Sequence, residues 1–237
     1  MSKIIEYIKS LFKQQNTIST KQIDRAMFFR QVQNHLGKLT EEQVKYIDLL
    51  LDFMLSDPKL TDYRHIAYIL ATVKHETAGT YRSDSKEVRQ GKTDTERRRK
   101  VRALQDRYWY SGYYGRSYPH LTWHDNYKKA EEFVRLDYPQ LLKQWETRTG
   151  KVFDLTVGDQ PNDKDDPDNV LDPEIGYAVL ASGMIRGWFT GFKLSDHIND
   201  KKADYVGARR TVNGVDQALS ISSYAHSFAK ALKAAGL

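Results

Sequence analysis

The chain has 237 residues, 40% of them hydrophobic, which is enough to bury a substantial core in one globular domain or in one domain of two lobes. It contains no cysteine, which excludes disulfides and thiolate metal sites and leaves packing to hold the fold. The net charge of +6 favours an anionic partner: nucleic acid, a membrane surface or a cell-wall polymer.

The N-terminal segment, residues 1–20, is basic and predicts a short amphipathic helix, with Ile4, Ile8 and Leu11 on one side. We expect this helix to dock on the body of the protein, because so short a segment has little apolar surface for holding a membrane. The segment lacks the apolar core of a signal peptide, and the sequence has no run of about 18 apolar residues. We therefore expect a soluble protein without stable membrane insertion, located in the cytoplasm of the producing cell.

Three helices separated by short turns are predicted next. The first covers residues 20–36 and ends at Gly37, and the second begins at Thr40, where Gln43 completes a capping box. The third lies within residues 61–79, which read TDYRHIAYILATVKHETAG.

Glu76 lies near the end of this third helix. Ile66, Ile69 and Val73 form an apolar stripe at helical spacing, and Glu76 falls on the same line. The carboxylate is therefore expected to point inward, where it could act as a general acid. The alternative is a helix end in solvent, with Gly79 as the stop signal.

Residues 82–107 show no periodicity and carry ten Lys or Arg against five Asp or Glu. Because they contain no recognisable nucleic-acid motif, we interpret them as a solvated loop rather than a nucleic-acid interface. The loop could also hold an anionic polymer in a neighbouring cleft. It contains Glu87, the nearest candidate for a second catalytic carboxylate.

The next stretch, YWYSGYYGRSYPHLTWHDNY, alternates glycines and aromatic residues with polar ones. Such a segment could simply pack a loop onto the protein. It also supplies stacking faces, a hydroxyl group and an amide, which together suit a carbohydrate subsite. The candidate residues are Tyr113, Tyr114, Arg116, Thr122, Trp123 and Asn126.

The remaining sequence predicts further helices. One is expected over about residues 126–147, and the acidic residues 154–174 are interpreted as a surface loop because their spacing does not fit a calcium site. Asp172 and Pro173 then mark a helix start. The helix EIGYAVLASGMIRGWF is apolar nearly all round, which predicts a central buried helix between two lobes. The expected fold class is all-α, with little or no β-structure.

Four motifs in this order resemble the family 19 glycoside hydrolases, and more closely their phage endolysin and prophage lysozyme branch than the plant chitinases. The motifs are HETAG, YYGRSYPHLTWHDNYKKA, DPEIGYAVLASGMIRGWFTGFKLSDHI and DYVGARRTVNG followed by SYAHSFAKAL. The resemblance covers roughly residues 25–235. It implies one lysozyme-like catalytic domain over residues 1–237 and cleavage of β-1,4 bonds in a polymer that contains N-acetylglucosamine.

The resemblance also implies roles for single residues. Glu76 would be the general acid, Glu87 would activate water or stabilise positive charge on the sugar ring, and Thr122 would help to orient the water. The other matched positions would shape the cleft or contact substrate; they are Tyr113, Tyr114, Arg116, His120, Trp123, Asn126 and Asn213. No metal and no organic cofactor are implied.

Three departures from the family pattern matter. Ser117 and His120 replace the usual Gly after YYGR and Gln before LTW, so a sugar contact could be altered or lost. The loop to Glu87 is about one residue longer than in many endolysins, which leaves Glu96 as a rival for the second carboxylate. The chitinase arginine that pairs with the acid is absent from the final helix, which favours the endolysin branch or puts the pairing on Arg209 or Arg210.

The sequence therefore predicts a monomeric, muramidase-like peptidoglycan hydrolase that works with two glutamates and reaches the wall after release or delivery. Two carboxyl groups separated by roughly 6.5–9.5 Å would leave room for water and give inversion at the anomeric carbon. The alternatives are a chitinase and a wall-binding protein that has lost catalysis. A nucleic-acid binder is disfavoured, because the basic cluster is not placed on a groove-reading helix.

Overall fold

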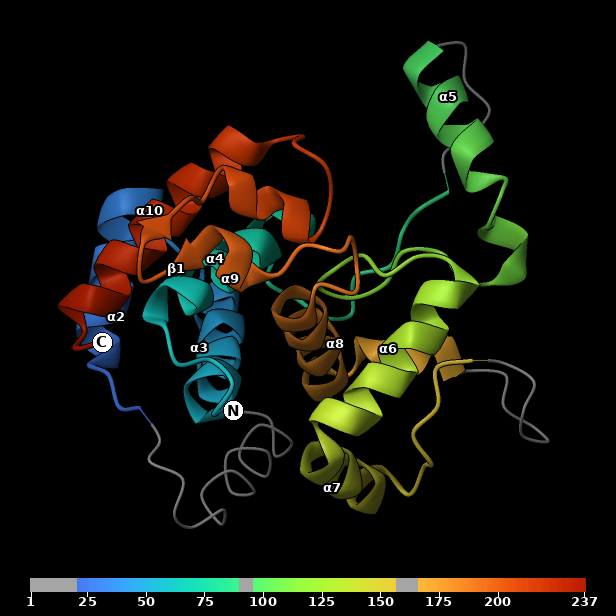
Figure 1. The fold of residues 1–237 in the computed structure, drawn as a ribbon, viewed down its shortest axis with the longest axis horizontal. Coiled ribbons are helices and arrows are strands. Elements are labelled where there is room, and N and C mark those ends of the chain that lie inside the picture. The colour runs from blue at the N-terminus through green and yellow to red at the C-terminus, as the bar shows by residue number, and fades with distance from the viewer. Residues whose placement is uncertain (1–20, 90–95, 157–165) are drawn as a thin grey trace. The chain divides into compact units, whose positions relative to one another are not determined.

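The computed structural model describes residues 21–89, 96–156 and 166–237, shown in colour in Figure 1. The basic segment of residues 1–20 lies outside the described residues. The described part is predominantly helical, and its only strands are the short antiparallel pair β1 (Ile198–Asn199) and β2 (Lys202–Ala203). The predicted all-α class with little β-structure is thus confirmed.

The described residues form α-helices and short 3-10 helices (η) along the chain. They are α2 (Arg25–Leu36), α3 (Glu41–Ser56), α4 (Tyr63–Glu76), α5 (Glu96–Gln105), η1 (Trp109–Ser111), α6 (His124–Asp137), α7 (Pro139–Thr149), η2 (Asp166–Leu171), α8 (Pro173–Arg186), α9 (Leu194–His197), η3 (Gly207–Thr211) and α10 (Ala218–Ala234).

The chain divides into two compact units. The first contains the described residues up to 72 together with residues 197–208 and 215–237, and the second contains the described parts of 73–196 together with 209–214. Helix α4 passes from the first unit into the second and carries Glu76 as its last residue.

Helices α2 and α10 pack along each other in the first unit (Figure 1). Phe28 of α2 and Phe228 of α10 are fully buried, and burial of each such side chain contributes about 1.5–3 kcal/mol. The predicted capping box at Thr40 is confirmed: its hydroxyl accepts from the Gln43 N–H at 3.1 Å, and the Gln43 side chain accepts from the Thr40 N–H at 2.9 Å. Helix α3 therefore begins where the capping box placed it. Helix α2 ends before Gly37 as predicted but begins at Arg25, later than expected, because Asp24 caps it.

Helix α8 is the buried helix of the second unit and packs against α6, α7 and η2. Asp172 caps it, accepting a hydrogen bond from the Glu174 N–H at 3.1 Å, and Gly187 ends it with a positive φ of 80°. Every residue from Glu174 to Met184 is buried, as the all-round apolar sequence predicted.

Two sequence predictions need correction. The single helix expected over residues 126–147 is two helices, α6 and α7, because Pro139 lacks an N–H and disfavours helical geometry at Tyr138. Part of the loop expected over residues 82–107 is helix α5. Its sequence, ERRRKVRALQ, consists almost wholly of strong helix formers, which form a helix without the apolar stripe that a periodicity search detects.

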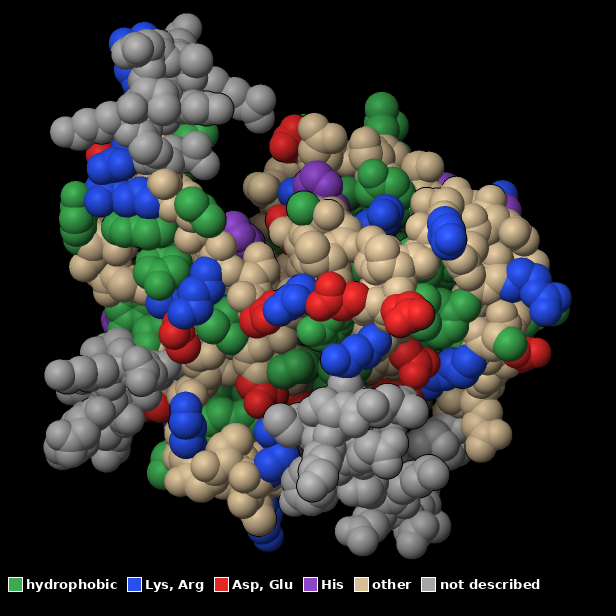
Figure 2. Space-filling model, turned by 180° about the vertical axis from the view of Figure 1, so that it is seen from behind, with side chains coloured by type: hydrophobic (Ala, Val, Ile, Leu, Met, Phe, Trp, Pro, Cys, Tyr) green, Lys and Arg blue, Asp and Glu red, His purple; other side chains and the backbone are tan. Residues whose placement is uncertain are grey.

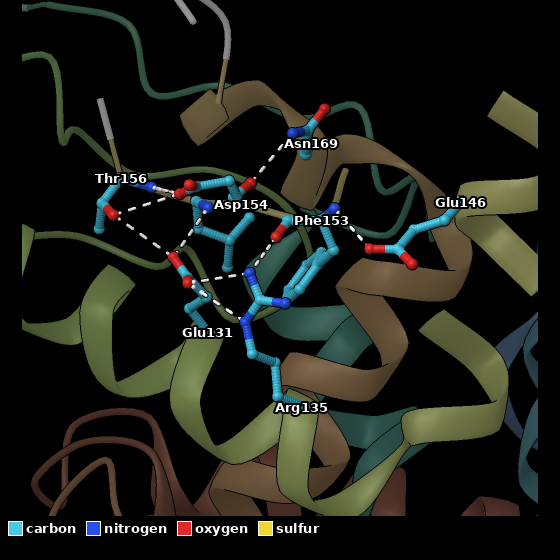
Figure 3. Close-up of polar contacts among 8 residues, drawn as sticks. Glu131, Arg135, Glu146, Phe153, Asp154, Thr156 and Asn169 are labelled. Atoms are coloured by element: carbon cyan, nitrogen blue, oxygen red, sulfur yellow. Dashed lines mark hydrogen bonds and ion pairs between the residues drawn. The ribbon is translucent and has the colours of Figure 1, made fainter. Parts of the chain in front are cut away.

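A polar cluster fixes the segment after α7 (Figure 3). The Glu131 carboxylate on α6 accepts hydrogen bonds from the Leu155 N–H at 3.2 Å and from the Thr156 hydroxyl at 3.3 Å, and Glu146 on α7 accepts from the Phe153 N–H at 2.8 Å. These carboxylates satisfy backbone groups of an irregular segment, so their role here is structural.

Candidate active site

A cavity of about 430 Å³ lies in the second unit, and all of its lining residues belong to that unit. It brings together residues from distant stretches of sequence. The predicted site residues that line it are Glu76, His120, Thr122, Trp123, Asn126 and Asn213.

Glu76 forms an ion pair with Arg209, whose Nη1 lies 2.6 Å from Glu76 Oε1. The Glu76 side chain is 17% exposed and that of Arg209 only 3%. The inward direction predicted from the apolar stripe is confirmed, since the Glu76 side chain is mostly buried and lines the cavity, in line with the fully buried Ile66, Ile69 and Val73. Of the two arginines that the sequence offered as partners of the acid, Arg209 makes the contact.

The wall formed by residues 120–126 is held by local hydrogen bonds. The Thr122 hydroxyl donates to the His120 carbonyl at 2.8 Å, and the Asn126 amide donates to the Thr122 carbonyl at 2.8 Å. His120 and Trp123 have positive φ values of 53° and 77°, a conformation that is uncommon for residues other than glycine. Strained backbone of this kind occurs preferentially at functional sites.

Asn213 contributes to the cavity from the other segment of the unit. Its own side-chain oxygen accepts a hydrogen bond from the Gly214 N–H at 2.8 Å. The Asn213 N–H donates to the Arg209 carbonyl at 3.1 Å, so the turn that carries Asn213 also fixes the residue that pairs with Glu76.

Three predicted substrate residues lie outside the cavity lining. Arg116 is 5% exposed and forms an ion pair with Asp168 at 2.6 Å. Its guanidinium carbon lies 3.9 Å from the centroid of the Tyr114 ring. Tyr113 is buried and packs edge-on against Tyr127. Arg116, Tyr113 and Tyr114 therefore make contacts within the protein that stabilise their loop, and they do not line the cavity.

Glu87 is not among the described residues that line the cavity, but its carboxylate accepts a hydrogen bond from Tyr108, which does line it. Burial alone would raise the pKa of the Glu87 carboxyl, but hydrogen bonds from Gln105, from the Gly115 N–H and from the Tyr108 hydroxyl outweigh it and lower the pKa. Glu87 is therefore held as an anion. The rival carboxylate, Glu96, is the first residue of α5, and its side chain lies outside the described atoms.

Tyr108 is the most informative residue that sequence reasoning missed, because it both lines the cavity and contacts Glu87. It belongs to the same aromatic run as Tyr113, which was the signal that could have found it. Leu104, Phe189 and Val212 also line the cavity, and as isolated apolar residues they carried no comparable signal.

Within the described residues, no group of three or more acidic or histidine side chains is placed to hold a metal ion. In the same segments, no helix has both the length and the apolar character needed to cross a membrane. Comparison of the chain with protein-family models, with curated proteins and with solved structures gives no match.

Proposed function

We propose that the protein is a glycoside hydrolase of the bacterial cell wall, which cleaves β-1,4 bonds of peptidoglycan through general acid and base catalysis. The observation that carries the proposal is the Glu76–Arg209 ion pair on the wall of a cavity that also gathers Thr122, Asn126 and Asn213. The resemblance to family 19 hydrolases implies roles for the same residues.

This chemistry requires one protonated and one ionised carboxyl group. Glu76 faces the cavity and is proposed to protonate the leaving oxygen, with Arg209 fixing the position of its carboxyl group. Glu87 is held as an anion and is proposed to activate water or to stabilise positive charge on the sugar ring. Glu87 is not among the residues that line the cavity, so we propose that it acts there through a water molecule.

Polar and aromatic groups in the cavity suit a sugar chain. Trp123 is 37% exposed and offers a stacking face, and the Thr122 hydroxyl oxygen and the Asn126 and Asn213 amides offer hydrogen bonds. The arrangement requires no cofactor.

The basic side chains of α5 support an anionic substrate. Figure 2 shows Lys and Arg side chains gathered with hydrophobic ones in the α5 region, at upper left, and Leu104 of α5 lines the cavity. A positive surface beside a cleft raises the encounter rate with an anionic polymer and is screened by salt. Hydrolysis of peptidoglycan is therefore expected to slow as ionic strength rises; salt-independent lysis would contradict this part of the proposal.

The test is the release of reducing ends from purified peptidoglycan and, in parallel, from chitin oligomers. Glu76→Gln keeps the size of the side chain and removes the acid, so activity should fall about 10²–10⁴-fold, the usual contribution of general acid catalysis. Glu132→Gln, the same change at an exposed position on α6, is the matched control and should remain active.

Each outcome assigns the protein to a class. Cleavage of peptidoglycan that is lost in Glu76→Gln supports the proposal, and mass spectrometry of the fragments identifies the bond. Cleavage restricted to chitin oligomers assigns a chitinase instead. If the wild type sediments with walls but releases no reducing ends, the chain is a binding protein that has lost catalysis.

A further inference from the structure

Three hydrogen-bond donors surround the carboxylate of Glu87. Oε1 accepts from Gln105 Nε2 at 2.8 Å and from the Tyr108 hydroxyl at 2.7 Å, and Oε2 accepts from the Gly115 N–H at 2.9 Å. A carboxylate has about four acceptor positions, so most of them are occupied within the protein. The orientation of the group is thereby fixed.

Both side-chain donors come from one short piece of chain at the end of α5. Gln105 is the last residue of that helix, and the Tyr108 N–H donates to the Gln105 carbonyl at 3.1 Å. The Gln105 amide nitrogen also donates to the Val88 carbonyl at 3.1 Å. Because both neighbours are acceptors, the amide must present its NH₂ group, and it cannot flip without losing both bonds.

Tyr108 connects this cluster to the cavity. Its side chain lines the cavity, and its ring packs edge-on against Trp123 with a centroid separation of 4.8 Å, while its hydroxyl group reaches Glu87. Tyr108 and Gln105 are 7% and 2% exposed. Because both side chains are buried, water has little access to compete for their hydrogen bonds to Glu87.

We propose that Tyr108 and Gln105 are positioning residues for Glu87, which fix the orientation of its carboxylate beside the cavity and favour its anion through hydrogen bonds. The catalytic meaning of this inference rests on the proposed function, whereas the hydrogen bonding itself does not. The lowered pKa of Glu87 agrees with the geometry. The reciprocal effect is seen at Tyr108, where burial and the Glu87 carboxylate raise the pKa of the phenol.

A purely structural role for the cluster makes a different prediction. If Tyr108 and Gln105 only anchored the loop that carries Glu87, their removal would lower stability without changing the ionisation of Glu87. Among the described residues, His120 also acts on this carboxylate and lowers the pKa of Glu87 further. Variants that keep His120 therefore isolate the contribution of the two donors.

The deciding experiment is an NMR titration of the glutamate carboxyl carbons in the full-length protein, with Glu87→Gln used to assign the Glu87 signal. Tyr108→Phe and Gln105→Leu each remove one donor while roughly keeping the volume. Each is expected to raise the pKa of Glu87 by about one unit, since a hydrogen bond to a charged group is worth about that much. Tyr110→Phe is the matched control, because Tyr110 is 77% exposed and its hydroxyl contacts Arg89.

The pH profile of peptidoglycan hydrolysis supplies the second readout. In Tyr108→Phe the acid limb of kcat/KM should move to higher pH, because Glu87 must lose its proton at a higher pH to act as an anion. An unchanged Glu87 titration in both folded variants, or an activity loss that is equal at every pH, would overturn the positioning role. If the wild type cuts no peptidoglycan, the proposed function fails, and the NMR titration still decides whether these donors hold Glu87.

Discussion

The Glu76–Arg209 ion pair gives the sharpest test of how the site is built. Two unit charges about 4 Å apart attract by about 4 kcal/mol at the effective dielectric constant of about 20 that describes protein sites. Desolvation of both groups offsets part of this attraction, because the side chains are only 17% and 3% exposed. We therefore expect a coupling free energy of about 2 kcal/mol between them.

The coupling can be measured with a double-mutant cycle of Glu76→Gln and Arg209→Met, which keep most of the side-chain volume. Each single change leaves one charge buried without its counter-charge and should cost about 3 kcal/mol. The double variant should cost about 2 kcal/mol less than the sum of the singles. Arg210→Met, at the exposed neighbouring position, is the matched control and should change stability by less than about 0.5 kcal/mol.

Urea unfolding followed by tryptophan fluorescence suits this measurement. All four tryptophans, Trp109, Trp123, Trp145 and Trp188, belong to the second unit, as do Glu76 and Arg209. The signal therefore reports the unit that contains the ion pair, and linear extrapolation gives its free energy of unfolding. Additive costs in the double variant would show that the ion pair contributes no stability, and the argument from burial would then be wrong.

Three further results are expected. The folded pKa of Glu87 lies below its unfolded value of about 4.3. The hydrogen bonds to its carboxylate therefore stabilise the protein above that pH, and this contribution is lost as the pH falls through the folded pKa. The difference in unfolding free energy between wild type and Glu87→Gln should accordingly shrink on acidification. In Gly176→Ala, the added methyl group would collide with the buried Ser117 hydroxyl and lie 3.0 Å from the Val170 carbonyl oxygen, which should cost about 1–3 kcal/mol in urea unfolding. Ser117→Gly in the same chain removes the first collision and should restore part of the loss; no recovery at all would refute that collision. Removal of the capping box by Thr40→Ala should cost about 1 kcal/mol, measured as a lower midpoint of helix unfolding by circular dichroism, and an unchanged midpoint would mean that the cap is not needed.

The sequence determined the local structure wherever that structure depends on interactions between residues close together in the chain. The capping box at Thr40, the cap and proline at the start of α8 and the apolar stripe of α4 all lie where the pattern predicted them. Each depends on interactions within a few residues, which a linear pattern contains in full. Helix α5 and the break between α6 and α7 are also local, since they follow from helix propensity and from Pro139, but neither produces the apolar periodicity on which the helix predictions rested.

The candidate site could be named in part from motifs, but only the tertiary structure decided which residues meet. Arg209 and Arg210 are adjacent and chemically equal in the sequence, yet only the packing of their segment buries Arg209 against Glu76. Arg116 appeared equipped to bind substrate, but its guanidinium lies among Asp168, Gly112 and Tyr114. No sequence pattern connects Tyr108 and Gln105 with Glu87, but in the folded chain both donate hydrogen bonds to its carboxylate. Such contacts join residues far apart in the chain, and which of several equivalent side chains makes them depends on the packing of the whole unit.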